Sequence, residues 1–190
     1  VVFVWGLPQV KALLDTIFAL VKAINAGTGA ASVDLLLGTS KQIAGVAYAN
    51  ASVYQQVPQG ATTLNYEATE TPGTTIASVP ATLVPATDTS TFVTGPAGAL
   101  QAYVLTDLNL PPVGSNVRMR FVNTSWNSSP LNVAVNNVPQ ASNVAFPNAS
   151  GYVQLASGTY PITFTDAVTG AVVLQLENVN LTAAGTYTVY

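Results

Sequence analysis

The chain has 190 residues, of which 49% are hydrophobic and only 7% are charged, whereas ordinary domains contain about 25% charged residues. Its net charge of −3 and its few dispersed cations exclude the basic surface that nucleic acid requires. Cysteine and histidine are absent, which excludes disulfides, thiol nucleophiles and the usual zinc sites. No run of about 18 apolar residues occurs. We therefore expect no transmembrane segment, no metal and no cofactor.

The first predicted element is a strand at residues 1–6, VVFVWG, that is apolar on both faces. Side chains alternate along a strand, and a strand with one wet face normally carries polar residues on that face. The apolar residues are Val1, Phe3 and Trp5 on one face and Val2 and Val4 on the other. Either another element of the same domain or another protein molecule must therefore cover the second face.

The second predicted element is a helical insertion at about residues 8–26. Its apolar residues follow helical spacing along one broad stripe, Pro8 suits the helix entry and Gly27 suits the exit. Side chains of this kind are costly to leave in water, so the stripe must pack either on the sheet of its own domain or on a neighbouring subunit. The candidate subunit-interface residues on the stripe are Leu13, Leu14, Ile17, Phe18 and Val21.

Beyond the helix the sequence repeats itself at an offset of 98 residues. Residues 45–68 and 143–166 align without a gap over 24 positions, of which eight are identical. In the same alignment residues 1–6 lie over 119–124, so the helical segment is interpreted as an insertion in the first copy. The chain is therefore predicted to be a tandem duplication.

The remaining sequence consists of short alternating strands separated by turns rich in glycine and proline, a pattern typical of β-sandwiches. We predict an all-β protein of two tandem immunoglobulin-like β-sandwich domains at residues 1–107 and 117–190, joined by a proline-stiffened linker at 108–116. The first copy continues into a further strand at 98–107, which has no counterpart in the second copy. The second sandwich is therefore predicted to lack its last strand and to expose an unpaired edge.

Three segments carry a family resemblance: VRMRFVNTS at 117–125, NVAFPNASGYVQLASGTYPITF at 143–164 and AAGTYTV at 183–189. They resemble a secreted family of tandem immunoglobulin-like repeats labelled a domain of unknown function, whose copies open on an R-F-V-N-A-S-like strand and end on an A-G-x-x-Y-T-V-like strand. The resemblance covers residues 75–190 and extends more loosely over the first copy. It implies a sandwich fold and an extracellular or cell-surface location, and it implies no enzyme activity.

The sequence contains no constellation typical of catalysis. Its acidic residues are dispersed, and the nearest pair, Glu67 and Glu70, lies beside a threonine-rich loop where carboxylates are more often solvated than catalytic. Ser40 and Lys41 are adjacent, but adjacent side chains at a strand end point apart. We therefore expect that the protein is not an enzyme.

Sequons of the form N-x-S/T make glycosylation a candidate modification if the source glycosylates exported proteins. The candidate sites are Asn50, Asn123, Asn127, Asn148 and Asn180. Asn50 and Asn148 occupy matching turn positions in the two copies, and Asn123 falls on the asparagine of the family's opening strand. A structural role is therefore the alternative at these three positions.

An apolar strand at one end and an unpaired sandwich edge at the other favour head-to-tail association by β-strand addition. The predicted function is that of a structural subunit of an extracellular filament or pilus-like fibre, in which residues 1–6 insert into the second domain of the next copy. Its partners would be copies of itself and, at the sequons, glycans. The alternative is a monomeric cell-surface adhesion or binding module, in which residues 1–6 form the first strand of their own domain.

Overall fold

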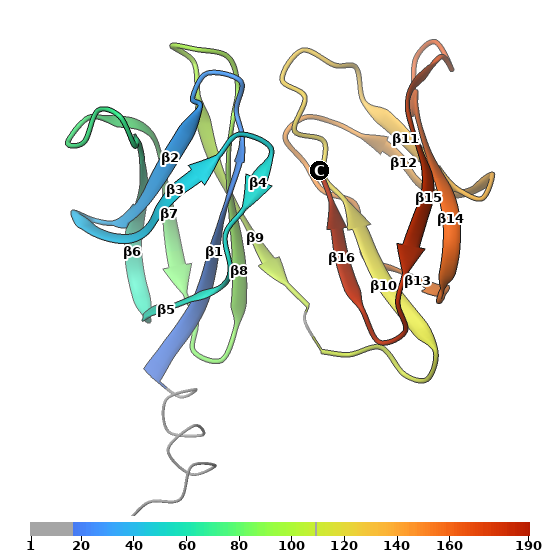
Figure 1. Ribbon diagram of the computed structural model, residues 1–190, viewed down its shortest axis with the longest axis horizontal. Helices are drawn as coiled ribbons and strands as arrows, with labels where there is room; N and C mark the ends of the chain where they lie inside the picture. Colours follow the sequence, from blue (N-terminus) through green and yellow to red (C-terminus); the bar gives the residue numbers. More distant parts are fainter. Residues whose placement is uncertain (1–16, 109) are drawn as a thin grey trace, which may run out of the picture. The chain divides into compact units, whose positions relative to one another are not determined.

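A computed structural model describes residues 17–108 and 110–190 (Figure 1). The described chain is all-β and divides into two compact units, the first ending at Asp107 and the second beginning at Leu108. The strands of the first unit are β1 (Phe18–Ala26), β2 (Ser32–Leu37), β3 (Ser40–Ala47), β4 (Asn50–Ala51), β5 (Gln55–Pro58), β6 (Gly60–Ala68), β7 (Thr75–Leu83), β8 (Asp88–Thr94) and β9 (Gln101–Asp107). Those of the second unit are β10 (Asn116–Phe121), β11 (Leu131–Val135), β12 (Val138–Val144), β13 (Val153–Ala156), β14 (Gly158–Asp166), β15 (Val172–Leu181) and β16 (Thr186–Val189).

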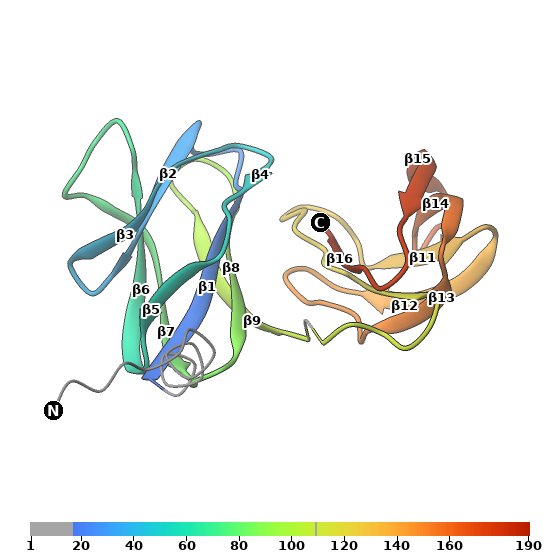
Figure 2. The same cartoon turned by 60° about the horizontal axis from the view of Figure 1, so that its bottom comes forward.

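Two sheets build the first unit. In one sheet β1 is parallel to β8 and antiparallel to β4 and β5, and β9 extends the sheet beyond β8. The other sheet has the antiparallel order β3-β2-β6-β7. Figures 1 and 2 show β2, β3 and β6 on one side of the unit and β1 and β8 on the other. Fully buried side chains such as Val21, Leu35, Leu64 and Tyr66 form the core of the unit.

The second unit repeats this plan with fewer strands. One sheet has the order β13-β10-β16, with β10 parallel to β16, and the other has the antiparallel order β12-β11-β14-β15. Met119, Phe121 and Ile162 are fully buried in its core. The rings of Phe121 and Phe164 meet edge to face, with centroids 6.0 Å apart and an interplanar angle of 82°, the arrangement that aromatic quadrupoles favour.

Strand pairing recurs in the two units at the 98-residue offset. Ala19 of β1 lies opposite Val57, and Val117 of β10 lies opposite Leu155. The parallel pairings of β1 with β8 and of β10 with β16 show the same offset. β1 is therefore the counterpart of β10, and the alignment of residues 1–6 with 119–124 is wrong.

The prediction of a helix at residues 8–26 is wrong over Phe18–Ala26, because these residues form strand β1. Residues 8–16 lie outside the described residues. The segment is apolar at so many positions that helical spacing and strand spacing are both satisfied. In the fold Val21 and Ile24, which point to opposite faces of the strand, are both buried. Tertiary burial of both faces therefore decides in favour of a central strand.

Candidate strand-binding site

The two units differ in what lies beside the last strand of their parallel pair. In the first unit β8 lies between β1 and β9, and β9 is antiparallel to β8 from Thr94 opposite Gln101 to Asp88 opposite Asp107. In the second unit β16 occupies the place of β8 and pairs with β10. Among the described residues no strand lies on the other side of β16. This edge presents main-chain N–H and C=O groups that a further strand can bind.

In the first unit β9 closes the core as well as the sheet. Leu100, Ala102 and Val104 pack against the core cluster, and β9 contacts β7 of the opposite sheet. Ala77 of β7, which lies opposite Tyr66 of β6, is only 8% exposed. The closing strand therefore covers apolar side chains of both sheets.

The equivalent region of the second unit is an open groove of about 490 Å³. Its apolar lining includes Leu131, Phe164, Val173, Leu174, Leu176 and Val189. Leu174 lies opposite Phe164 as Ala77 lies opposite Tyr66, but Leu174 is 49% exposed. Full burial of a leucine side chain is worth about 1.5–3 kcal/mol, so a strand that covered this groove would gain free energy from Leu174 alone.

The groove is also lined by polar side chains. Asn123, Ser128 and Asp166 belong to its lining. Hydrogen bonds from the backbone N–H groups of Thr169 and Val168 lower the pKa of the Asp166 carboxyl below its ordinary value. That carboxylate therefore accepts hydrogen bonds within the turn between β14 and β15. The groove is thus lined by both apolar and polar side chains, a combination that an extended peptide can bind.

β16 itself has an unsatisfied polar group. The Oγ1 atom of Thr186 is buried and has no hydrogen-bond partner within the described part of the chain. A buried hydroxyl without a partner costs free energy, and native proteins seldom retain one. The hydroxyl is covered by protein, so it is the exposed Leu174 that indicates incomplete cover on the groove side of the second unit.

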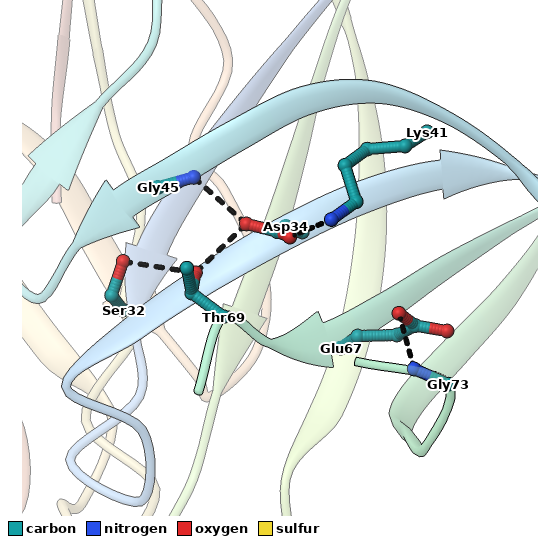
Figure 3. A network of polar contacts seen from close by, with 7 residues as sticks. All are labelled: Ser32, Asp34, Lys41, Gly45, Glu67, Thr69 and Gly73. Atoms are coloured by element: carbon teal, nitrogen blue, oxygen red, sulfur yellow. Dashed lines mark hydrogen bonds and ion pairs between the residues drawn. The ribbon is translucent and has the colours of Figure 1, made fainter. Parts of the chain in front are cut away.

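A second polar site is the network around Asp34, on β2 of the first unit (Figure 3). Its carboxylate is buried and accepts hydrogen bonds from the Gly45 N–H and the Thr69 hydroxyl, both at 2.8 Å. Lys41 Nζ lies 2.5 Å from the other carboxylate oxygen. Burial raises the pKa of Asp34, but the hydrogen bonds from Lys41, Gly45 and Thr69 lower it, and the pKa lies below its ordinary value. The carboxylate therefore stays charged at neutral pH.

The second unit shows what this network does. Asn132, at the position equivalent to Asp34, accepts a hydrogen bond of 2.9 Å from the backbone N–H of Asn143, which is equivalent to Gly45. Gly45 and Asn143 both have positive φ, at 68° and 54°, in strands whose pairing shifts register there. An uncharged amide thus pins the same β-bulge. The Asp34 network is a structural device of the sheet edge.

Three of the residues considered for catalysis, Ser40, Lys41 and Glu67, have polar partners of their own. Glu67 is buried, and its carboxylate accepts a hydrogen bond from the Gly73 N–H at 3.0 Å (Figure 3). Lys41 is paired with Asp34, and the Ser40 hydroxyl accepts a hydrogen bond from Gln42. Within residues 17–108 and 110–190, no group of three or more acidic, histidine or cysteine side chains could hold a metal ion.

Most of the predicted interface residues lie outside the described part of the chain. These are Val1, Val2, Phe3, Val4, Trp5, Leu13 and Leu14. Ile17 immediately precedes β1 and is 44% exposed. Phe18 is half-buried at the start of β1, and Val21 is fully buried in the core of the first unit. The prediction that Phe18 and Val21 belong to an interface helix is therefore wrong, because they belong to a strand and Val21 contributes to its own core.

The sequons fall into two groups. Asn50, Asn127, Asn148 and Asn180 are exposed. Asn123 is buried, and its Nδ2 atom donates to the Val144 carbonyl at 3.1 Å. Asn123 is therefore not an available glycan acceptor in the folded protein, which favours the structural alternative at this position.

An unpaired edge in the second unit was predicted from the sequence, but the residues of the groove beside it were not. A usable signal was present: β15 has three consecutive apolar residues at 172–174, whereas β7 carries Pro80, a residue that protects exposed strand edges. All three are exposed. Which strand they flank depends on the sheet order, which local patterns do not reveal.

These features define an all-β protein of two sandwich-like units with one shared strand plan. The sequence matches the family described as "Domain of unknown function (DUF4397)" over residues 19–134 and again over residues 125–190. The chain belongs to this family. No curated protein matches it. In the described residues, no helix is long and apolar enough to cross a membrane.

Proposed function

We propose that the two units are immunoglobulin-like sandwiches and that the protein is a structural subunit of an extracellular filament or pilus-like fibre. In this proposal the subunits assemble head to tail by β-strand addition. The groove of the second unit accepts residues 1–6 of another copy. The observation that carries the proposal is the contrast between the first unit, whose groove β9 fills, and the second unit, whose groove is open.

The position of β1 supports the choice of donor. Phe18–Ala26 occupies the opening-strand position of the first unit, where it pairs with β5 and β8. The first unit therefore does not need residues 1–6 for this position. Their apolar side chains on both faces suit a strand that is buried by another molecule. A donor and an acceptor on different parts of one chain form a heterologous interface, which produces filaments when the rotation does not close.

The composition also suits a polymer outside the cell. Only 7% of the residues are charged, so the surface depends on hydroxyl and amide groups for its hydration. Contacts between subunits would replace part of that hydration. The family resemblance, with its extracellular or cell-surface location, supports the same setting.

Negative-stain electron microscopy of the full 190-residue chain, beside a variant that lacks residues 1–6, tests the proposal. We expect filaments in the first sample and single particles in the second. A matched control replaces Val2 and Val4 by alanine, which keeps the length of the segment and removes apolar surface from one face only. Monodisperse single particles of the full chain, with size-exclusion light scattering at the monomer mass, would refute the filament and favour the adhesion module.

Glycans remain proposed partners at the exposed sequons only. Protein isolated from its natural source and treated with an N-glycosidase should lose mass if any of these is occupied. We expect any deamidation that marks a former glycan at Asn50, Asn127, Asn148 or Asn180 and none at Asn123, because Asn123 is 2% exposed. A mark at Asn123 would contradict the assignment of this side chain to the core.

A further inference from the structure

The strand that closes the first unit and the segment proposed to close the second have matching side-chain patterns. Residues 101–106 read QAYVLT and residues 1–6 read VVFVWG. Placed side by side, both show an aliphatic residue, an aromatic residue, a valine and a large apolar residue in succession at their second to fifth positions. This comparison rests on the proposed function, since it takes residues 1–6 as the donor.

The structure gives each of these positions a direction in the first unit. Ala102 is buried in the core cluster and Val104 packs against it. Because side chains alternate, Tyr103 and Leu105 point to the opposite face of the sheet. The inward positions of β9 are therefore aliphatic, and its aromatic residue faces outward. By the same pattern, the inward residues of the donor are Val2 and Val4.

The repeat also supplies the register. In the first unit Thr91 of β8 lies opposite Val104 and Phe92 lies opposite Tyr103. By the 98-residue offset that relates β8 to β16, Val189 is equivalent to Thr91 and Tyr190 is equivalent to Phe92. Val189 lines the groove and packs against the core of the second unit.

We infer that residues 1–6 of one copy bind antiparallel to β16 of another copy in the register of β9. Val4 then lies opposite Val189 and Phe3 lies opposite Tyr190. Val2 and Val4 enter the groove, where they cover Leu174, and Phe3 and Trp5 face outward. The interface is specified by main-chain pairing along β16 and by two aliphatic side chains.

Disulfide trapping tests this register, because the chain contains no cysteine of its own. Residues directly opposite in an antiparallel pair have Cα atoms about 4.5–5.5 Å apart, within the range that a disulfide spans. The double variant Val4→Cys, Val189→Cys is oxidised with oxidised glutathione and run on a non-reducing gel. We expect a ladder of covalent multimers. Each single variant offers one thiol per chain and should stop at a dimer.

The matched control is Val4→Cys, Tyr187→Cys, which places the second thiol two residues away on the same inward face of β16. Few or no multimers are expected from this pair. A second test pair is Phe3→Cys with Tyr190→Cys. Because Tyr190 is 40% exposed, this pair remains usable if the Val189→Cys variant fails to fold. Circular dichroism under reducing conditions verifies that each variant is folded.

The outcomes separate the register from the function. Ladders in the Tyr187 pair but in neither test pair would overturn the register while leaving strand addition in place. Filaments in the microscope without a ladder in any folded pair would overturn residues 1–6 as the donor. An intramolecular disulfide without multimers would show that the segment folds back on its own chain, and this result together with single particles would overturn both proposals.

Discussion

Replacing Asp34 separates the two roles of its carboxylate, which pins a β-bulge and pairs with Lys41. In Asp34→Asn the side-chain oxygen remains and can accept the hydrogen bond from the Gly45 N–H, as Asn132 does from the Asn143 N–H. In Asp34→Ala this acceptor is lost. Both variants therefore lose the charge, but only Asp34→Asn can keep the hydrogen bond that holds the bulge.

The structure sets the expected size of each effect. Asp34→Ala removes two hydrogen bonds to a buried charged group, from Gly45 and Thr69, and each is worth about 1.5–3 kcal/mol. Partial replacement by water reduces the sum, and we expect a loss of about 2–4 kcal/mol in the free energy of unfolding of the first unit. Asp34→Asn loses only the pairing with Lys41, whose side chain is 43% exposed, so its effect is small.

The pH dependence has a definite sign. The pKa of Asp34 is lower in the folded protein than its ordinary value, which for an unfolded chain is about 3.9. The unfolded state therefore binds the proton first, and the stability contributed by the charged carboxylate is present above about pH 4 and is lost as the pH falls below it. Asp34→Asn lacks this titration. The stability difference between the wild type and Asp34→Asn should shrink as the pH falls below about 4.

Hydrogen–deuterium exchange read by mass spectrometry measures the effect in each unit separately. Peptides from β2 and β3 report the first unit, and peptides from β11 and β12 serve as an internal reference that the substitutions should leave unchanged. Asn132→Ala is the matched control, with the pattern reversed. If Asp34→Asn proves as damaging as Asp34→Ala, the ion pair and not the bulge hydrogen bond holds the edge, and the reasoning from the repeat is refuted.

Three further predictions concern the core and the groove. Tyr66→Phe should destabilise the first unit by about 1 kcal/mol, because it removes the buried hydroxyl that donates a 2.9 Å hydrogen bond to the Thr91 carbonyl. Urea denaturation measures the loss, and an unchanged midpoint would contradict this prediction. Appending a copy of residues 93–107 after Tyr190 should supply the second unit with its own closing strand, raise its melting temperature and suppress filaments. The same extension with a proline at the position of Val104 should have none of these effects, because proline cannot donate to the strand pairing. Equal melting temperatures for the two extensions would contradict strand addition. Asn123→Ala should accelerate hydrogen exchange around the β10–β11 loop, because the Val144 carbonyl loses a buried donor; unchanged exchange would show that water replaces the amide.

Some features of the fold follow from the sequence with little tertiary information. Sparse charge, short alternating segments and turn residues predict an all-β protein, which the structure confirms. The 98-residue offset, visible in matching residues at 45–68 and 143–166, recurs in the strand pairing. These are properties of local pattern and linear spacing, and so they can be read before the chain is folded.

The error at β1 has the opposite origin. Residues 18–26 are apolar at positions that satisfy both a helix and a strand, so local periodicity could not decide between them. Their partners in the sheet, β5 and β8, are 34–40 and 68 residues away along the chain. Only these long-range pairings, which bury both faces of the strand, select the extended conformation.

The candidate site shows the same division. By itself the sequence determined that the first copy has a closing strand and that Asn50 and Asn148 occupy equivalent positions of the repeat. Only the tertiary structure decided that Leu174 is exposed at a position where Ala77 of the first unit is buried. It also decided that Asn123 is buried and that Asp34 and Asn132 accept hydrogen bonds from equivalent β-bulges. The reason is physical: exposure and hydrogen bonding depend on which strands become neighbours, and sheet order brings together residues that no local pattern connects.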